Sequence, residues 1–90
     1  MMADAEKVSR LLKTARGQID GILRMIEEDR YCMDISNQIQ ATSSILKKTQ
    51  LEVMKAHMHS CVRESFETGS PEDRNKKIEE VLHLLEKAAP

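Results

Sequence analysis

The stretch KAHMHSCVRES, residues 55–65, sets a histidine and a cysteine four residues apart in a run that is otherwise typical of a helix. Side chains at this spacing lie on the same face of an α-helix, so His57 and Cys61 are placed to bind one metal ion. Two ligands rarely make a complete site, and the only other cysteine, Cys32, lies far upstream. A metal site here therefore needs a third ligand from elsewhere.

Two thiolates and one imidazole form a soft ligand set, which favours Cu(I), Zn(II) and related ions over Mg(II), Ca(II) or Mn(II). Zn(II) usually takes a fourth ligand, which no residue clearly supplies, whereas Cu(I) is satisfied by three. His59 is expected on another face of the helix, and we interpret it and His83 as surface or packing residues. A buried cysteine can also serve as a small apolar side chain, so the spacing leaves a purely structural interpretation open.

Enzyme chemistry has no signature in this chain. There is no glycine-rich loop that could hold a phosphate, no nucleophile with an orienting pair of residues, and no convergent pair of acids. We therefore expect no enzyme activity, no catalytic residue and no small-molecule substrate.

The elements that must position these ligands are three predicted helices, over residues 4–28, 33–67 and 71–88. In the first, apolar residues recur at alternating spacings of four and three, as in a helical bundle; they are Val8, Leu12, Ala15, Ile19, Ile22 and Ile26. The second segment has no proline or glycine for more than thirty residues. Gly69 is expected to end it, and Ser70, Pro71 and Asp73 are typical of a helix start.

Gly17 and Gly21 lie one turn apart inside the first predicted helix. Each glycine costs a helix about 1 kcal/mol relative to alanine. We interpret the pair as a place where another helix comes close.

The second predicted helix is too long for the other two helices of the same chain to cover its apolar stripe. Its length therefore predicts a bundle of antiparallel helices completed by another copy of the chain. Cys32 and His57 are about 25 positions apart on this helix, which separates them by nearly 40 Å if it is straight. An antiparallel partner instead brings Cys32 of the partner subunit beside His57 and Cys61, which makes two identical sites per dimer.

The composition is that of a small all-α protein, with 90 residues, 32% of them charged and 40% hydrophobic. We expect a single domain over residues 1–90. No apolar run approaches the roughly 20 residues of a membrane span, and the N-terminus lacks the apolar stretch of a signal peptide, so we expect a cytoplasmic protein without a membrane partner. The net charge is −1, but basic residues dominate the first half and acidic residues the last part. This layout permits a basic face and equally permits ordinary solvated helices.

Three sequence blocks, RGQIDGI, YCMDISNQIQA and HMHSC, together resemble the CsoR/RcnR family of bacterial transcriptional repressors. The resemblance covers residues 8–85. It implies an all-helical chain that forms antiparallel dimers and then a tetramer, a dimer of dimers, without a helix-turn-helix. It also implies binding to operator DNA that ends when an inducer binds.

The resemblance also implies the inducer. Cys32, His57 and Cys61 match the Cys-His-Cys pattern of the family's copper(I) sensors, whose site bridges two subunits. Nickel and cobalt sensors have a histidine at the position of Cys61, and formaldehyde sensors lack that second cysteine. Persulfide sensors keep both cysteines but lack the histidine, so His57 favours Cu(I).

Two residues around the metal-bound histidine are implied as well. In the family's copper sensors a tyrosine before the first cysteine and a glutamate on the third helix contact the outer side of that histidine. Tyr31 and Glu80 hold these places here, with Glu79 as the neighbouring alternative. Such contacts fix the orientation of a ligating imidazole.

For DNA, the family uses basic residues of its first two helices. The matching candidates here are Arg10, Lys13, Arg16, Lys47 and Lys48. Many members carry Arg-Leu-Lys before the first glycine, whereas here Leu11 and Leu12 precede Lys13 and the arginine comes one position earlier. The identity of the arginine that contacts DNA is therefore open.

The expected function is a copper(I)-responsive repressor that binds operator DNA without metal and releases it on Cu(I) binding. One alternative is a repressor that senses persulfide or thiol oxidation through Cys32 and Cys61 alone. Another is a copper-binding module that has no DNA function.

Overall fold

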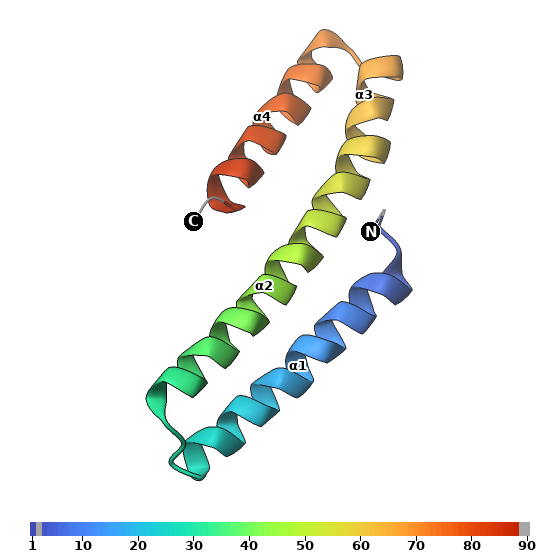
Figure 1. The fold of residues 1–90 in the computed structure, drawn as a ribbon. Coiled ribbons are helices and arrows are strands. Elements are labelled where there is room, and N and C mark those ends of the chain that lie inside the picture. The colour runs from blue at the N-terminus through green and yellow to red at the C-terminus, as the bar shows by residue number, and fades with distance from the viewer. Residues whose placement is uncertain (2, 89–90) are drawn as a thin grey trace. The chain divides into compact units, whose positions relative to one another are not determined.

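A computed structural model describes residues 1 and 3–88, apart from the side chains of Cys61, Val62 and Ala88. The chain is all-α, as predicted, and no strand occurs in the part that is described. Its elements are α1 (Ala5–Glu27), α2 (Cys32–His57), a π-helical turn η1 (Met58–Val62), α3 (Arg63–Thr68) and α4 (Pro71–Ala88) (Figure 1). Because η1 and α3 continue α2 without a break, the described residues form three helical rods.

The chain divides into two compact units, which we describe separately. The N-terminal unit is Asp4–Leu51 and contains α1 and most of α2. The C-terminal unit begins at Glu52 and also includes the first three residues of the chain. No helix in the described ranges is both long enough and apolar enough to cross a membrane.

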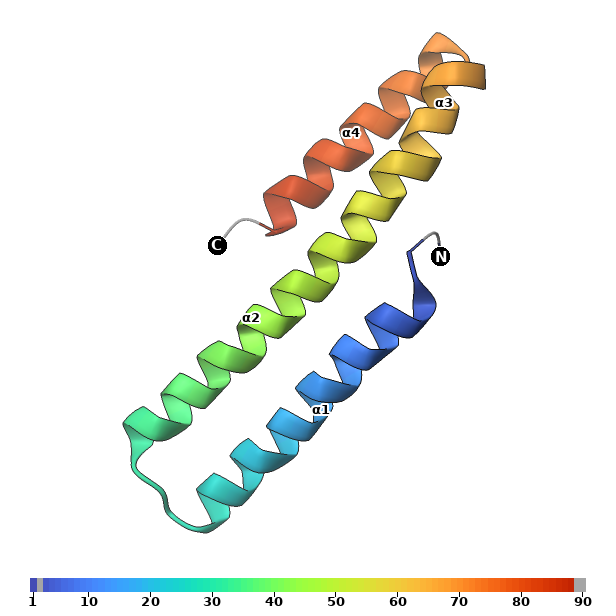
Figure 2. The same ribbon diagram turned by 45° about the vertical axis from the view of Figure 1, so that its right-hand side comes forward.

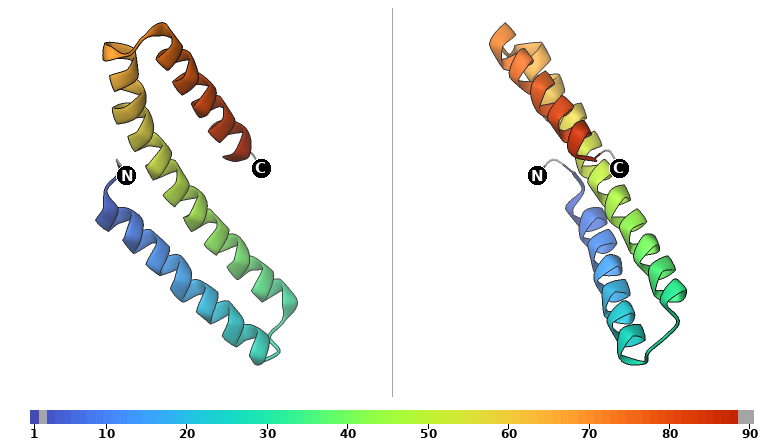
Figure 3. Two further views of the ribbon diagram at one scale, coloured as in Figure 1. Left: turned by 180° about the vertical axis from the view of Figure 1, so that it is seen from behind. Right: turned by 90° about the vertical axis from the view of Figure 1, so that its left-hand side faces the viewer.

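In the N-terminal unit, α1 starts at a well-formed cap. The Asp4 carboxylate accepts hydrogen bonds from the backbone N–H groups of Glu6 and Lys7 at 3.0 and 3.2 Å. These bonds satisfy donors that the first turn of a helix leaves unpaired. After α1, Asp29 has a φ of 54°, in the left-handed region that aspartate tolerates better than most residues, and the chain turns into α2. The two helices then run antiparallel, side by side (Figures 2 and 3).

The buried seam between α1 and α2 is formed by side chains that recur every seven residues along each helix. They are Val8, Ala15 and Ile22 on α1 with Thr42 and Thr49 on α2. The predicted apolar stripe is therefore only half covered within the chain, because Leu12, Ile19 and Ile26 are each about half exposed. Among the described residues, Gly17 has no atom within 4 Å of where a Cβ would lie, so no helix of this part of the chain comes close to it as predicted.

In the C-terminal unit, the helix after His57 changes its hydrogen-bonding pattern. The Arg63 N–H donates to the Met58 carbonyl five residues earlier, which defines a π-helical turn. The helix predicted over residues 33–67 is continuous, but the sequence did not predict the π-turn within it, since apolar periodicity does not reveal one residue inserted into a helix. π-Turns of this kind occur frequently at functional sites.

The turn between α3 and α4 follows the predicted pattern. The Gly69 N–H donates to the Ser65 carbonyl at 2.9 Å, and a Cβ on Gly69 would lie 2.5 Å from that oxygen, so lack of space demands glycine here. Ser70 and Asp73 then cap α4 reciprocally, each side chain accepting from the other's backbone N–H, at 3.2 and 3.3 Å. With this cap, α4 begins at Pro71. After the turn α4 runs back alongside α3 (Figure 1).

Candidate metal centre

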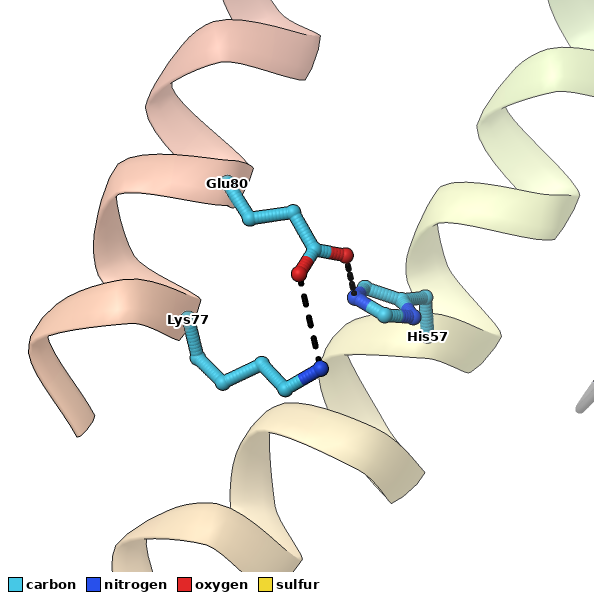
Figure 4. Close-up of polar contacts among 3 residues, drawn as sticks. All are labelled: His57, Lys77 and Glu80. Carbon is cyan, nitrogen blue, oxygen red and sulfur yellow. Dashed lines mark hydrogen bonds and ion pairs between the residues drawn. The ribbon is translucent and has the colours of Figure 1, made fainter. Parts of the chain in front are cut away.

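His57 is the last residue of α2, directly before the π-turn. Its Nε2 lies 2.8 Å from Oε1 of Glu80 on α4 (Figure 4). Nε2 is shielded from solvent, and the contact has the distance of an ion pair although its angles fall outside those of a hydrogen bond. We therefore describe it as an electrostatic contact between an imidazole and a carboxylate.

The other ring nitrogen of His57, Nδ1, points away from Glu80 (Figure 4). A ligating imidazole binds a metal through one nitrogen and directs its remaining N–H to an acceptor. A carboxylate beside Nε2 favours the tautomer with hydrogen on Nε2, which leaves the Nδ1 lone pair free. The arrangement of His57 therefore suits a metal ligand that binds through Nδ1.

Glu80 is the carboxylate in contact with His57, and its neighbour Glu79 is exposed. The second oxygen of Glu80, Oε2, lies 3.4 Å from Nζ of Lys77 (Figure 4). Sequence reasoning missed Lys77, although its spacing three residues before Glu80 on one helix is a recognisable signal for an ion pair.

Of the two predicted cysteine ligands, the structure describes the side chain of Cys32 but not that of Cys61. Cys32 is the first residue of α2 and carries an exposed, free thiol in the N-terminal unit. Cys61 lies within the π-turn, and its side chain is outside the described residues. Among the side chains that are described, no three of histidine, cysteine, aspartate and glutamate gather into a group that could hold a metal ion.

The remaining candidates around the site are surface residues. Tyr31, which precedes α2 in the N-terminal unit, is 66% exposed, and its contact with a metal-bound histidine stays a prediction. His59 and His83 are both exposed.

The candidate DNA-binding residues all belong to the N-terminal unit and are all exposed; they are Arg10, Lys13 and Arg16 on α1 and Lys47 and Lys48 on α2. The three on α1 follow one another at spacings of three residues, so they occupy neighbouring turns of one helix. Arg10 and Lys13 also line a shallow depression together with Ser9. An exposed group of cations is suited to contacts with phosphates, which position a protein on DNA without reading its sequence.

The chain is similar to known transcriptional repressors in sequence. The family described as metal-sensitive transcriptional repressor matches residues 4–87. The copper-sensing transcriptional repressor CsoR of Bacillus subtilis is 34% identical over 84 residues, which cover 93% of this chain and 80% of that protein. The copper-sensing transcriptional repressor RicR of Mycobacterium tuberculosis is 38% identical over 66 residues, which cover 73% of this chain and 69% of that protein.

A solved structure has the same fold. The nickel-responsive transcriptional regulator InrS superposes with a TM-score of 0.81 over 99% of this chain and 97% of its own, at 20% sequence identity. The match over residues 4–87, the similarity to these two repressors and this shared fold agree with one another. The chain belongs to the metal-sensitive transcriptional repressors, the CsoR/RcnR family.

Proposed function

We propose that this protein represses transcription by binding operator DNA in its metal-free form and releases the DNA when Cu(I) binds to Cys32, His57 and Cys61. The observation that carries the proposal is the 2.8 Å contact between Nε2 of His57 and Glu80, since it leaves Nδ1 free for a metal and links the imidazole to α4. As a member of a family of transcriptional repressors, the protein is not an enzyme, and DNA is its partner.

Cu(I) is favoured over Ni(II) by the chemistry of the ligands. Two thiolates and one imidazole are soft donors, and soft donors select Cu(I). The relatives from Bacillus subtilis and Mycobacterium tuberculosis described above are both named as copper-sensing repressors. The nickel-responsive regulator is 20% identical and supports the fold alone.

The complete site requires a second copy of the chain. Cys32 and His57 stand at opposite ends of α2, so we assign the third ligand to Cys32 of the partner subunit. Large apolar side chains of the N-terminal unit are about half exposed and available to a partner; they are Leu12, Ile19, Leu23, Ile26, Met33, Ile39, Leu46 and Leu51. Burial of such side chains is the main driving force for association. An antiparallel dimer, and a tetramer of two dimers, would cover them.

His57 connects the metal site with the rest of the bundle. Bound Cu(I) would hold ligands from two subunits in one fixed geometry. His57 presents Nδ1 on the ligand side and Nε2 on the side of Glu80, so a change in the tilt of the ring displaces Glu80 and the helix that carries it. Tyr31 of the partner subunit, which precedes the partner's Cys32, is proposed to join this contact. If this rearrangement weakens DNA binding, linkage requires that DNA weaken Cu(I) binding by the same factor.

The basic residues of α1 and α2 supply the DNA contacts in this proposal. Arg10, Lys13, Arg16, Lys47 and Lys48 would pair with phosphates, which makes operator affinity fall steeply with salt concentration.

The test is an anaerobic Cu(I) titration of the reduced protein on fluorescent operator DNA, followed by anisotropy. The operator fragment is selected from random-sequence DNA with the metal-free protein. We expect release near one copper per chain, and we expect Cys32→Ala to abolish it. His59→Ala is the matched control, since His59 is an exposed histidine near the site, and it should behave as the wild type. Retention of DNA at saturating Cu(I) would contradict the proposal.

A persulfide or thiol-oxidation sensor is the second candidate, and the exposed free thiol of Cys32 favours it. This function predicts release by polysulfide in the same assay, with no loss in His57→Ala. A copper-binding module without DNA function predicts Cu(I) binding by a protein that selects no DNA at low salt.

A further inference from the structure

Glu80 is shared between two partners, one on each carboxylate oxygen (Figure 4). Oε1 lies 2.8 Å from Nε2 of His57, which comes from the end of α2. Oε2 lies 3.4 Å from Nζ of Lys77, which precedes Glu80 by three residues on α4. The three side chains all belong to the C-terminal unit, so their geometry is described within one compact body.

The two contacts differ in how well they are protected. The His57 side chain is 23% exposed, whereas those of Lys77 and Glu80 are 35% and 43% exposed. A glutamate with this exposure has several accessible rotamers, and holding it in one of them costs conformational entropy. A cation on the preceding turn of the same helix reduces that freedom, because it attracts the oxygen that His57 does not use.

We propose that Lys77 is a positioning residue of the metal-linked switch. By holding Oε2 it keeps Oε1 against Nε2 of His57, and it thereby sets how strongly the metal site is coupled to α4. The proposal deepens the copper-repressor function proposed above and rests on it for the effect on DNA. The effect on Glu80 itself requires no metal.

Lys76 provides a matched control. It has the same side chain, is the adjacent residue on α4, and lines the same open depression between α3 and α4 as Lys77 and Glu80. Lys76 lies four residues before Glu80 and is also its neighbour along the helix, but the contact with Glu80 in the structure is made by Lys77. Replacing either lysine with methionine removes the same charge and keeps a similar stem.

The first experiment uses the full-length, copper-free protein and records the ¹⁵N signals of the His57 imidazole by NMR. The Glu80→Gln variant serves as the reference, because its ¹⁵N spectrum shows the Nε2 signal of a His57 imidazole that has lost the carboxylate. We expect Lys77→Met to move the Nε2 signal toward that of Glu80→Gln, Lys77→Arg to stay near the wild type, and Lys76→Met to change nothing. If Glu80→Gln leaves the His57 signals unchanged, or if Lys77→Met and Lys76→Met behave alike, the proposal is overturned.

The second experiment measures the factor by which Cu(I) weakens operator binding. The interaction free energy of an exposed ion pair is small, so Lys77→Met should lower this factor by only about threefold. Lys76→Met should leave the factor unchanged. Combined with Glu80→Gln, Lys77→Met should have no further effect, since a residue that acts only through Glu80 adds nothing once that carboxylate is gone. Full additivity of the two changes would overturn the proposal.

The two experiments separate the two proposals. If the wild-type protein keeps its DNA at saturating Cu(I), the copper-repressor function fails, and the copper-free spectra still decide whether Lys77 positions Glu80. If the wild type releases DNA but Lys77→Met has no effect on spectra or coupling, only the role of Lys77 fails.

Discussion

Thr42 of α2 donates a 2.8 Å hydrogen bond from Oγ1 to Oε1 of Gln18 on α1, and it does so inside the buried seam of the N-terminal unit. The same hydroxyl lies 3.1 Å from the carbonyl of Gln38 in its own helix. A small polar side chain at this position lets the two helices approach closely while its hydroxyl stays satisfied. The pairing of α1 with α2 is therefore specified by a polar contact as well as by apolar burial.

Replacing Thr42 with valine should destabilise the protein. Valine keeps the shape of threonine but removes the donor, which leaves Gln18 Oε1 in the seam without this partner. We expect the free energy of unfolding to fall by about 1 kcal/mol. Urea unfolding at one fixed protein concentration measures it. Ser44→Ala is the control, because Ser44 is exposed and bonds only to a carbonyl of its own helix, at 3.1 Å. An equal loss in both variants would refute the role of the Gln18 contact.

Two glycine-to-alanine substitutions should change the free energy of unfolding in opposite directions. A Cβ at Gly69 would lie 2.5 Å from the Ser65 carbonyl, so Gly69→Ala should lower the free energy of unfolding by about 1–3 kcal/mol. A Cβ at Gly17 meets nothing within 4 Å, so Gly17→Ala should raise it by about 0.5–1 kcal/mol through better helix propensity. Thermal or urea unfolding measures both. A destabilised Gly17→Ala protein would instead show that a partner helix packs on this glycine.

The exposed apolar side chains of the N-terminal unit should be required for association. Leu46, 44% exposed, lies near the middle of α2, where we expect the two-fold axis of the dimer. Leu46→Glu places a charge in that interface, so we expect a shift toward monomer in sedimentation velocity at micromolar concentration. Ser44→Glu adds the same charge at an exposed position two residues away, on the other side of the helix, and should leave the sedimentation coefficient unchanged. A fully assembled Leu46→Glu protein would place the interface elsewhere.

Neutralising Glu80 should uncouple copper from DNA. Glu80→Gln removes the charge that faces Nε2 of His57 and leaves Nδ1 and both cysteines intact. We expect Cu(I) affinity to change little, while the factor by which Cu(I) weakens operator binding falls about tenfold. Competition titrations with a Cu(I) chelator, with and without operator DNA, give both numbers. Glu79→Gln should match the wild type, and equal effects at the two positions would rule out the contact with His57 as the link.

The sequence predicted the helices well because their signals are local. The α4 cap of Ser70 and Asp73, the residues that begin each helix and the heptad spacing of Val8, Ala15 and Ile22 all depend on neighbours within a few positions. The same pattern explains why the other half of the apolar stripe is exposed. The stripe is broader than the surface that one neighbouring helix can cover, so a second helix is needed to bury the rest.

The sequence missed two features that the spacing of apolar residues does not reveal. The π-turn at Met58–Val62 rotates the residues that follow it by an amount that periodicity alone does not reveal. The link from Lys77 through Glu80 to His57 depends on how α4 folds back toward the end of α2. The Glu80 position came from a family resemblance, and helix spacing alone would not have distinguished it from Glu79.

Operator binding should show the salt dependence of phosphate contacts carried by α1. Lys13→Gln removes one exposed cation near Arg10. We expect weaker binding to operator and non-operator DNA alike, and a slope of log affinity against log salt that is smaller by about 1, as for one lost phosphate contact. Arg74→Gln, which removes an exposed cation from α4, should leave the slope unchanged. Anisotropy titrations at several salt concentrations measure both variants. If Lys13→Gln lowers affinity for the operator but not for other DNA, Lys13 reads bases rather than phosphates, and the basic residues of α1 would then face the groove.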